Sequence, residues 1–178
     1  MRNKTTRFIT AAAIVAALYT VLSVLTNFIP TIGGVFQFRI AEAMCILPMF
    51  TPAAVPGLTL GCLLTNLING GTVYDIVFGT LATALGAVLS LLLAYRKNDI
   101  VGGRFLLRAV LAAIPPVVSN ALIIPYVIIK SSGLPMDLAT YAPFILSVGL
   151  EELVCAGLLG VALAFILRPH IKKMLAKE

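Results

Sequence analysis

Charged and amide side chains occur inside or beside apolar segments of this sequence, where such residues are rare. Arg39 and Glu42 lie at the start of the stretch FRIAEAMCILPMF, and others follow at Asn66, Asn69, Asp75, Asn120, Glu151 and Glu152. In a membrane helix each ionisable side chain costs roughly 2.5–3.5 kcal/mol on insertion scales, which makes it a candidate functional residue. The polar residues of this chain are therefore candidates for binding a polar solute.

The charges in this group do not balance. Arg39 is accompanied by three candidate carboxylates, those of Glu42, Asp75 and Glu151. An excess of negative charge in a low-dielectric environment favours either proton uptake or a bound cation. The residue types therefore predict a ligand that is cationic or rich in hydrogen-bond donors.

Spacing alone leaves the roles within each charged pair open. Arg39 and Glu42 are three residues apart, so on a helix they share a face and either pair with each other or face a solute. Glu151 and Glu152 are adjacent and point about 100° apart on a helix. We expect at most one of them, Glu151, to line a pocket, and Glu152 to cap a neighbouring helix or pair with a base.

The composition indicates which kind of protein carries these residues. Of the 178 residues, 60% are hydrophobic and 11% are charged, compared with roughly 45–50% and about 25% in soluble domains. A chain of this length cannot bury so many apolar side chains in its own core. We predict an all-α integral membrane protein in which residues 1–178 form a single polytopic domain.

Six apolar segments are candidate membrane spans, at residues 6–29, 35–50, 53–68, 74–94, 108–129 and 141–167. The second and third are short and are joined by the turn TPAAVP, so they are either two short spans or one re-entrant hairpin. Most of the 13 Lys and Arg residues flank the spans in three clusters, before the first, between the fourth and fifth, and after the last. Both arrangements place the clusters on one side, which predicts cytoplasmic termini and argues against nucleic-acid binding.

Motifs for catalysis are missing from the sequence. It contains no G-x-x-x-x-G-K-[ST] phosphate loop and no H-E-x-x-H, and its three cysteines form no C-x-x-C. The segment EELVCA begins like the E-E-x-x-x-R signature of intramembrane proteases, but Ala156 occupies the arginine position. We expect neither an enzyme nor a metal site.

The first span contains small residues at helical spacing. In TAAAIVAALYTVL, Ala12 and Ala16 form one pair four residues apart, and Ala13 and Ala17 form another. Small residues at this spacing let membrane helices approach closely. The sequence does not decide between packing inside the chain and docking of a partner protein.

Two longer stretches carry a family resemblance. FRIAEAMCILPMFTPAAVPGLTLGCLLTNLI, followed by DIVFGTLATALGA, resembles the substrate-binding subunits of energy-coupling factor (ECF) transporters, specifically the queuosine-precursor (QueT) family. The resemblance covers nearly the whole chain. It implies a multi-pass protein of the bacterial cell membrane that captures its ligand from outside and docks on a transmembrane coupling protein driven by two cytoplasmic ATPases. ATP would then be used by these partners, with no cofactor in this chain, and one of the two alanine pairs would form the docking face.

The ligands that this family implies are queuine or its precursor 7-aminomethyl-7-deazaguanine. A carboxylate can accept two parallel N–H donors from the guanine-like edge, and a second carboxylate suits the amine. We expect Glu42, Asp75 and Glu151 to supply these carboxylates, with Glu42 facing the ligand, while Arg39 orients Glu42 or faces the exocyclic carbonyl. Further expected contacts are amides that read the ring and aromatic side chains that stack on it: Asn69, Asn120, Phe38, Tyr74 and Tyr126.

Two other functions compete with this interpretation. The same carboxylates suit a proton- or cation-coupled carrier that works alone, and such a carrier would transport in liposomes without partner proteins. A membrane scaffold that transports nothing would need the carboxylates only for stability.

Overall fold

A computed structural model describes residues 3–26, 28, 38–96 and 103–175 of the chain. No strand occurs in these ranges. Four of the described helices are long and apolar enough to cross a membrane: Lys4–Thr26, Asp75–Ala94, Phe105–Ser132 and Leu138–Lys173. The prediction of an all-α membrane protein is confirmed.

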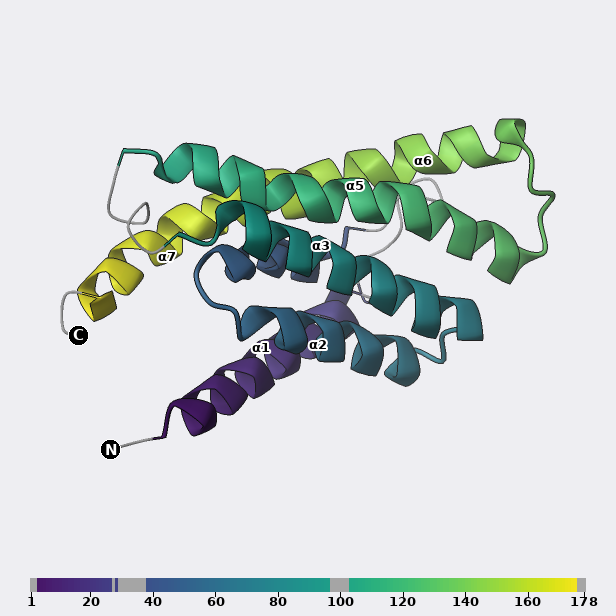
Figure 1. The fold of residues 1–178 in the computed structure, drawn as a ribbon. Helices are drawn as coiled ribbons and strands as arrows, with labels where there is room; N and C mark the ends of the chain where they lie inside the picture. Colours follow the sequence, from purple (N-terminus) through teal and green to yellow (C-terminus); the bar gives the residue numbers. More distant parts are fainter. Residues whose placement is uncertain (1–2, 27, 29–37, 97–102, 176–178) are drawn as a thin grey trace.

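The helices follow one another in an antiparallel bundle (Figure 1). The first three elements are α1 (Lys4–Thr26), the 3₁₀ helix η1 (Ile40–Met49) and α2 (Ala54–Ile68). A short π-helix, η2 (Asp75–Gly79), leads directly into α3 (Thr80–Ala94), and α5 covers Phe105–Ser132. The last helix is continuous through α6 (Leu138–Glu152), the π-helix η3 (Leu153–Leu159) and α7 (Gly160–Leu175).

The second and third helices are too short to cross a membrane as straight rods. At about 2.0 Å per residue η1 is about 20 Å long, and at 1.5 Å per residue α2 is about 22 Å long. Both fall short of the roughly 30 Å hydrocarbon core. The predicted helix over residues 35–50 differs from the structure, since the described helix begins at Ile40 and Arg39 precedes it with φ −92° and ψ 82°. Residues 35–37 lie outside the described ranges.

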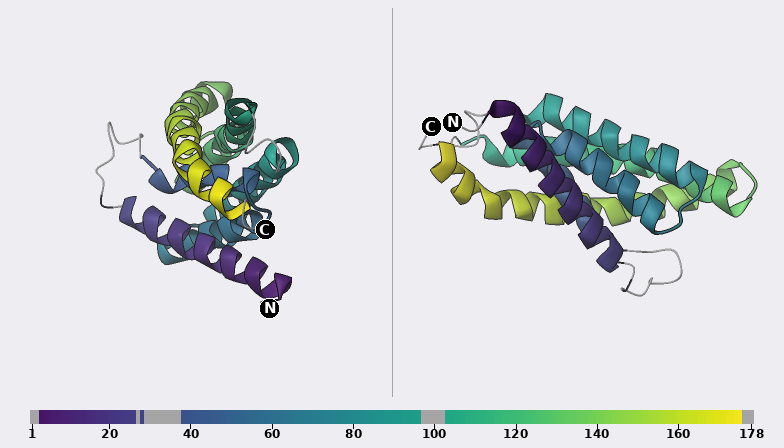
Figure 2. Two further views of the ribbon diagram at one scale, coloured as in Figure 1. Left: turned by 90° about the vertical axis from the view of Figure 1, so that its left-hand side faces the viewer. Right: turned by 90° about the horizontal axis from the view of Figure 1, so that it is seen from below.

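The basic clusters converge on one end of the bundle. The start of α1, the end of α3, the start of α5 and the end of α7 all lie at this end (Figures 1 and 2). These helix ends carry Lys4, Arg7, Arg96, Arg104, Arg108, Arg168, Lys172 and Lys173. The prediction that the clusters share one side is confirmed for these residues, while Arg2, Lys97 and Lys177 lie outside the described ranges.

Helices α1 and α2 pack almost backbone to backbone. A Cβ atom added to Gly57 would lie 2.8 Å from the Ala12 carbonyl oxygen, and one added to Gly61 would lie 3.0 Å from the Ala16 carbonyl oxygen. Ala12 and Ala16 are buried in this contact. Two small-xxx-small pairs therefore face each other inside the chain, the arrangement that brings membrane helices closest together.

Candidate ligand-binding cavity

A polar cavity of about 240 Å³ lies in the half of the bundle opposite the basic clusters. Its lining comes from the ends of α1 and α2, the starts of η1 and η2, the second half of α5, and α6 (Ser23, Thr26, Arg39, Thr65, Asn69, Asp75, Ile124, Ile128, Val148, Glu151 and Glu152). Ligand pockets for drug-sized molecules are typically about 300–1,000 Å³. The cavity is thus suited to a small ligand, and its polar residues carry charged, amide or hydroxyl groups.

Both glutamates at the end of α6 line the cavity. Glu151 is 7% exposed and Glu152 is 1% exposed. Glu151 interacts with the Arg39 backbone of η1, whereas Glu152 faces α5. The expectation that at most one of them lines a pocket is wrong, because the cavity lies at the junction of η1, α5 and α6 and receives side chains that point in two directions.

Asn120 of α5 holds the Glu152 carboxylate in place. Its Nδ2 donates a hydrogen bond to Glu152 Oε1 over 2.7 Å, and both residues are almost fully buried. Among the described residues, Asn120 Oδ1, Glu151 Oε1 and Glu152 Oε2 are buried atoms without a hydrogen-bond partner. A buried acceptor without a donor costs about 1–3 kcal/mol, so these three atoms favour a ligand that supplies donors.

Arg39 brings positive charge to the cavity. It precedes the first turn of η1 and interacts electrostatically with Glu42, Glu151 and Glu152. Because a 3₁₀ helix has three residues per turn, side chains three apart along it lie in one row. Arg39, Glu42 and Cys45 follow this spacing at the start of η1.

Glu42 lies behind the wall of the cavity. It is 1% exposed and is not among the described lining residues. Its Oε1 accepts a hydrogen bond from the Tyr19 hydroxyl at 2.6 Å, and its Oε2 accepts one from Cys45 Sγ at 3.2 Å. Glu42 thus has partners within the protein on both oxygens, and its contact with a ligand stays a prediction.

Asn69 and Asp75 also line the cavity, and Asn69 is exposed. Asp75 Oδ2 accepts hydrogen bonds from the Thr72 backbone N–H at 2.8 Å and from the Thr72 hydroxyl at 2.6 Å. Nearby, Asn66 Nδ2 donates to the Asp75 carbonyl oxygen at 2.8 Å. These bonds fix the start of η2, so the Asp75 carboxylate is positioned and partly satisfied before any ligand binds.

The three predicted stacking residues lie outside the described lining of the cavity. Phe78 stands between Tyr74 and Tyr126, with ring centroids 6.5 Å from the first and 5.4 Å from the second. Phe38 is half-buried directly before Arg39. The structure therefore groups Tyr74 and Tyr126 into an aromatic cluster with Phe78, and stacking of any of the three on a ligand stays a prediction.

Sequence reasoning missed several residues of the site. Tyr19 was not singled out, although it bonds to Glu42, and Ser23, Thr26 and Thr65 add hydroxyl groups to the lining. Serine and threonine are common in membrane helices, so no signal separates these three from their neighbours. The charge of Glu152 did mark it as a candidate site residue, because a carboxylate buried in a membrane protein needs a partner.

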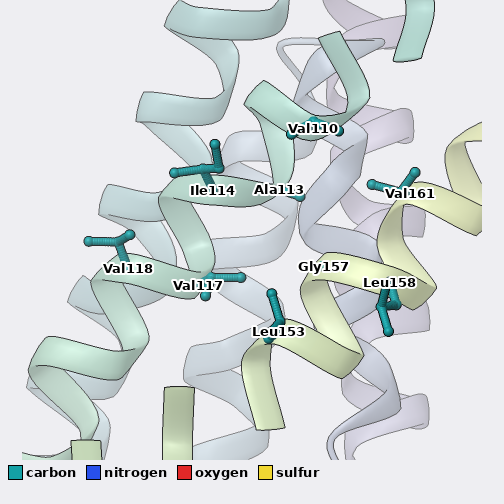
Figure 3. Close-up of a pocket in the computed structure, with 9 residues that line it drawn as sticks. All are labelled: Val110, Ala113, Ile114, Val117, Val118, Leu153, Gly157, Leu158 and Val161. Carbon is teal, nitrogen blue, oxygen red and sulfur yellow. The ribbon is translucent and has the colours of Figure 1, made fainter. Parts of the chain in front are cut away.

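A second cavity, of about 390 Å³, lies between α5 and the η3–α7 part of the last helix (Figure 3). The side chains drawn around it are all apolar, among them Ile114, Val118 and Leu158, which are 48%, 49% and 66% exposed. No described lining residue offers a polar side chain that would orient a solute. The larger cavity therefore suits hydrocarbon, and the smaller polar one is the candidate binding site.

The two alanine pairs of α1 differ in exposure. Ala12 and Ala16 are buried against α2, whereas Ala13 and Ala17 are exposed. The face that carries Ala13 and Ala17 also exposes Ile14 and Leu18. In the isolated chain, the second pair is the one open to another protein.

The fold and the cavity together define a multi-pass membrane protein with a buried polar site for a small solute. The sequence profile of the QueT transporter family matches residues 9–169, and the chain belongs to this family. It is 31% identical over 99 residues to a queuosine precursor transporter QueT of Lactococcus lactis subsp. cremoris (strain MG1363). That alignment covers 56% of this chain and 58% of the relative. No solved structure matches the chain.

This assignment confirms the family resemblance noted in the sequence and places the protein in a bacterial membrane. A transporter family favours transport over catalysis.

Proposed function

We propose that this protein is the substrate-capture subunit of an ECF importer and that it binds a queuosine precursor, queuine or 7-aminomethyl-7-deazaguanine. The observation that carries the proposal is the polar cavity lined by Glu151 and Glu152, each of which has a buried acceptor without a hydrogen-bond partner. Membership of the QueT transporter family and the named relative support the choice of ligand.

The ligand and the cavity are chemically complementary. A 7-deazaguanine offers N–H donors along its guanine-like edge, and the cavity offers carboxylates at Asp75, Glu151 and Glu152. A carboxylate can accept a pair of such donors in bidentate fashion. Arg39 and Asn69 line the same cavity and supply donors for the carbonyl oxygen of the base. We keep Glu42, Phe38, Tyr74 and Tyr126 as residues that support these contacts from behind or beside the lining.

The position of the cavity favours capture from outside. The positive-inside rule assigns the basic end of the bundle to the cytoplasm. The cavity lies in the other half, which would be the half toward the exterior. In the proposed ECF role, import requires partner proteins. The exposed Ala13–Ala17 face of α1 is the proposed contact with the coupling membrane protein. The two ATPases that act with this coupling protein would use the ATP.

Ligand binding and autonomous transport test this proposal together. The purified subunit is titrated calorimetrically with 7-aminomethyl-7-deazaguanine and queuine, with guanine as the control. The same preparation is reconstituted into liposomes with and without a proton gradient. We expect saturable binding of a deazaguanine and no uptake by the subunit alone.

Each of the other outcomes identifies a different failure. Absence of binding for both deazaguanines would reject the ligand. Uptake by the subunit alone, driven by a proton gradient, would reject the ECF role in favour of a coupled carrier. Addition of the coupling protein and both ATPases should restore ATP-dependent uptake if the proposal holds.

A further inference from the structure

We infer that Glu152, positioned by Asn120, contacts the ligand and that Glu151 and Glu152 together bind its cationic amine. This inference rests on the proposed function and deepens it by naming the part of the ligand that the paired carboxylates recognise. It also assigns a ligand contact to Glu152, for which the sequence predicted a helix cap or a basic partner instead.

Burial and hydrogen bonding are the first support. The Glu152 side chain is 1% exposed and lines the cavity, and its Oε2 has no partner although Oε1 is held by Asn120 at 2.7 Å. The neighbouring Glu151 is 7% exposed, lines the same cavity and leaves Oε1 unpaired. Two carboxylates that are nine-tenths buried thus line one cavity, and each has one oxygen without a hydrogen-bond partner.

The charge of the site is the second support. Glu42, Glu151 and Glu152 interact electrostatically with one another and with Arg39. Among the described lining residues Arg39 is the one cation. Part of its positive charge is compensated by Glu42, which is also hydrogen-bonded to Tyr19. One guanidinium cannot neutralise three carboxylates, and an uncompensated buried charge is costly. A cationic ligand group between Glu151 and Glu152 reduces this excess of negative charge.

The number of donors is the third support. A primary ammonium group carries three N–H donors and one positive charge. Glu151 Oε1 and Glu152 Oε2 are buried unpaired acceptors of lining residues, and Asn120, which holds Glu152 but is not a described lining residue, also has an unpaired Oδ1. The flat edge of a guanine-like base presents no positive charge. The ammonium group is therefore the part of the ligand that both donates hydrogen bonds to these acceptors and offsets negative charge of the carboxylates.

A pair of isosteric ligands isolates this contact. 7-Aminomethyl-7-deazaguanine and its 7-hydroxymethyl analogue differ by the replacement of the ammonium group with a neutral hydroxyl. We expect the wild-type subunit to bind the aminomethyl compound at least about tenfold more tightly, as a charge-assisted contact requires. In Glu152→Gln the preference should fall below about threefold, chiefly through weaker binding of the amine. Asp137→Asn, a carboxylate exchange at the opposite end of α6 from Glu152, should keep the wild-type ratio.

The ratio of the two affinities is measured within one preparation, so partial unfolding of a variant does not change it. A wild-type ratio near one would overturn the inference while the proposed function stands. An unchanged ratio in Glu152→Gln, or an equal loss for both compounds, would show that Glu152 is structural and would also overturn it. Failure of wild type to bind either compound would overturn the proposed function itself.

Discussion

The hydroxyl group of Tyr19 lies 2.6 Å from Glu42 Oε1, which joins the middle of α1 to the first turn of η1 across 23 positions of sequence. Tyr19 is 1% exposed, and its Cβ lies against the face of α2 where Gly61 has no side chain. The absence of a side chain at Gly61 therefore allows Tyr19 to reach the buried Glu42 carboxylate, which is not among the described lining residues of the candidate cavity.

Removing this hydroxyl should destabilise the protein. Tyr19→Phe leaves Glu42 Oε1 buried without its donor, and we expect a loss of about 1–3 kcal/mol in the free energy of unfolding. Thermal or denaturant unfolding in detergent measures this effect. Tyr95→Phe is the control, since the Tyr95 hydroxyl makes no hydrogen bond within the described residues, and it should alter stability by less than about 0.5 kcal/mol. Equal stability of both variants would contradict the structural role of the Tyr19–Glu42 bond.

The close contact of α1 and α2 predicts that alanine substitution destabilises the protein at the glycines of this contact but not at a glycine outside it. A Cβ at Gly57 or Gly61 would lie 2.7 Å from Val15 Cβ or 2.9 Å from Tyr19 Cβ, so Gly57→Ala and Gly61→Ala should each cost about 1–3 kcal/mol through overpacking. Gly149→Ala in α6 is the matched control, because its Cβ would meet Ala121 Cβ at an ordinary 3.6 Å. We expect the control to be neutral or slightly stabilising in the same unfolding measurement. A loss at Gly149 as large as at Gly61 would argue against the packing described.

The two alanine pairs of α1 should respond differently to bulky substitution. Ala13→Leu with Ala17→Leu changes an exposed face, so the subunit should stay folded and bind ligand but fail to co-purify with the proposed coupling membrane protein and ATPases. Ala12→Leu with Ala16→Leu should instead destabilise the subunit, because these side chains are buried against α2. Co-purification together with ligand titration separates the two effects. Normal assembly of the Ala13/Ala17 variant would show that this face is not the docking surface.

The exposed start of α6 predicts a local pH dependence. The Thr140 backbone N–H donates to Asp137 Oδ1 at 2.8 Å, and this bond, with the Thr140 side chain, holds the pKa of Asp137 below its usual value of 3.8. A lowered carboxyl pKa means that the capping contribution is present above about pH 4 and is lost as the pH falls through the folded-state pKa. The amide chemical shift of Thr140 should therefore titrate with a midpoint below 3.8.

Asp137→Asn tests the assignment of that titration, because asparagine keeps the helix cap but has no proton to gain. Its Thr140 amide should show no such midpoint. A wild-type midpoint at or above 3.8 would mean that the hydrogen bond does not persist in solution.

Long apolar runs made most of the fold predictable. The spans at residues 74–94 and 108–129 correspond closely to the helices Asp75–Ala94 and Phe105–Ser132, because a membrane requires about 20 apolar residues in a helix. The 3₁₀ geometry of η1 was not predictable, since its composition suits an α-helix equally well. The 3₁₀ geometry of η1 places Glu42 and Cys45 in one row, where Cys45 Sγ donates to Glu42 Oε2.

The site was predictable in its residue types more than in its contacts. Intramembrane charge pointed to Arg39, Asp75 and Glu151, and all three line the cavity. The roles of Glu42 and Glu152 depend on which side chains α1 and α5 place beside them, and those partners are 23 and 32 positions away. The alanine registers have identical spacing, so only the glycines of α2 distinguish the buried pair from the exposed one.

The two π-helical segments directly adjoin the acidic residues of the cavity: Asp75 begins η2, and η3 starts just after Glu152. A π-turn holds one residue more than the α-helical hydrogen-bonding pattern allows. Deleting a single residue from η3 would let α6 and α7 merge into a regular helix while each half keeps nearly its orientation about the helix axis, because the π-turn absorbs the extra residue. The π-helical segment η3 thus accommodates one extra residue directly after the two buried carboxylates, and the helix still continues from α6 into α7.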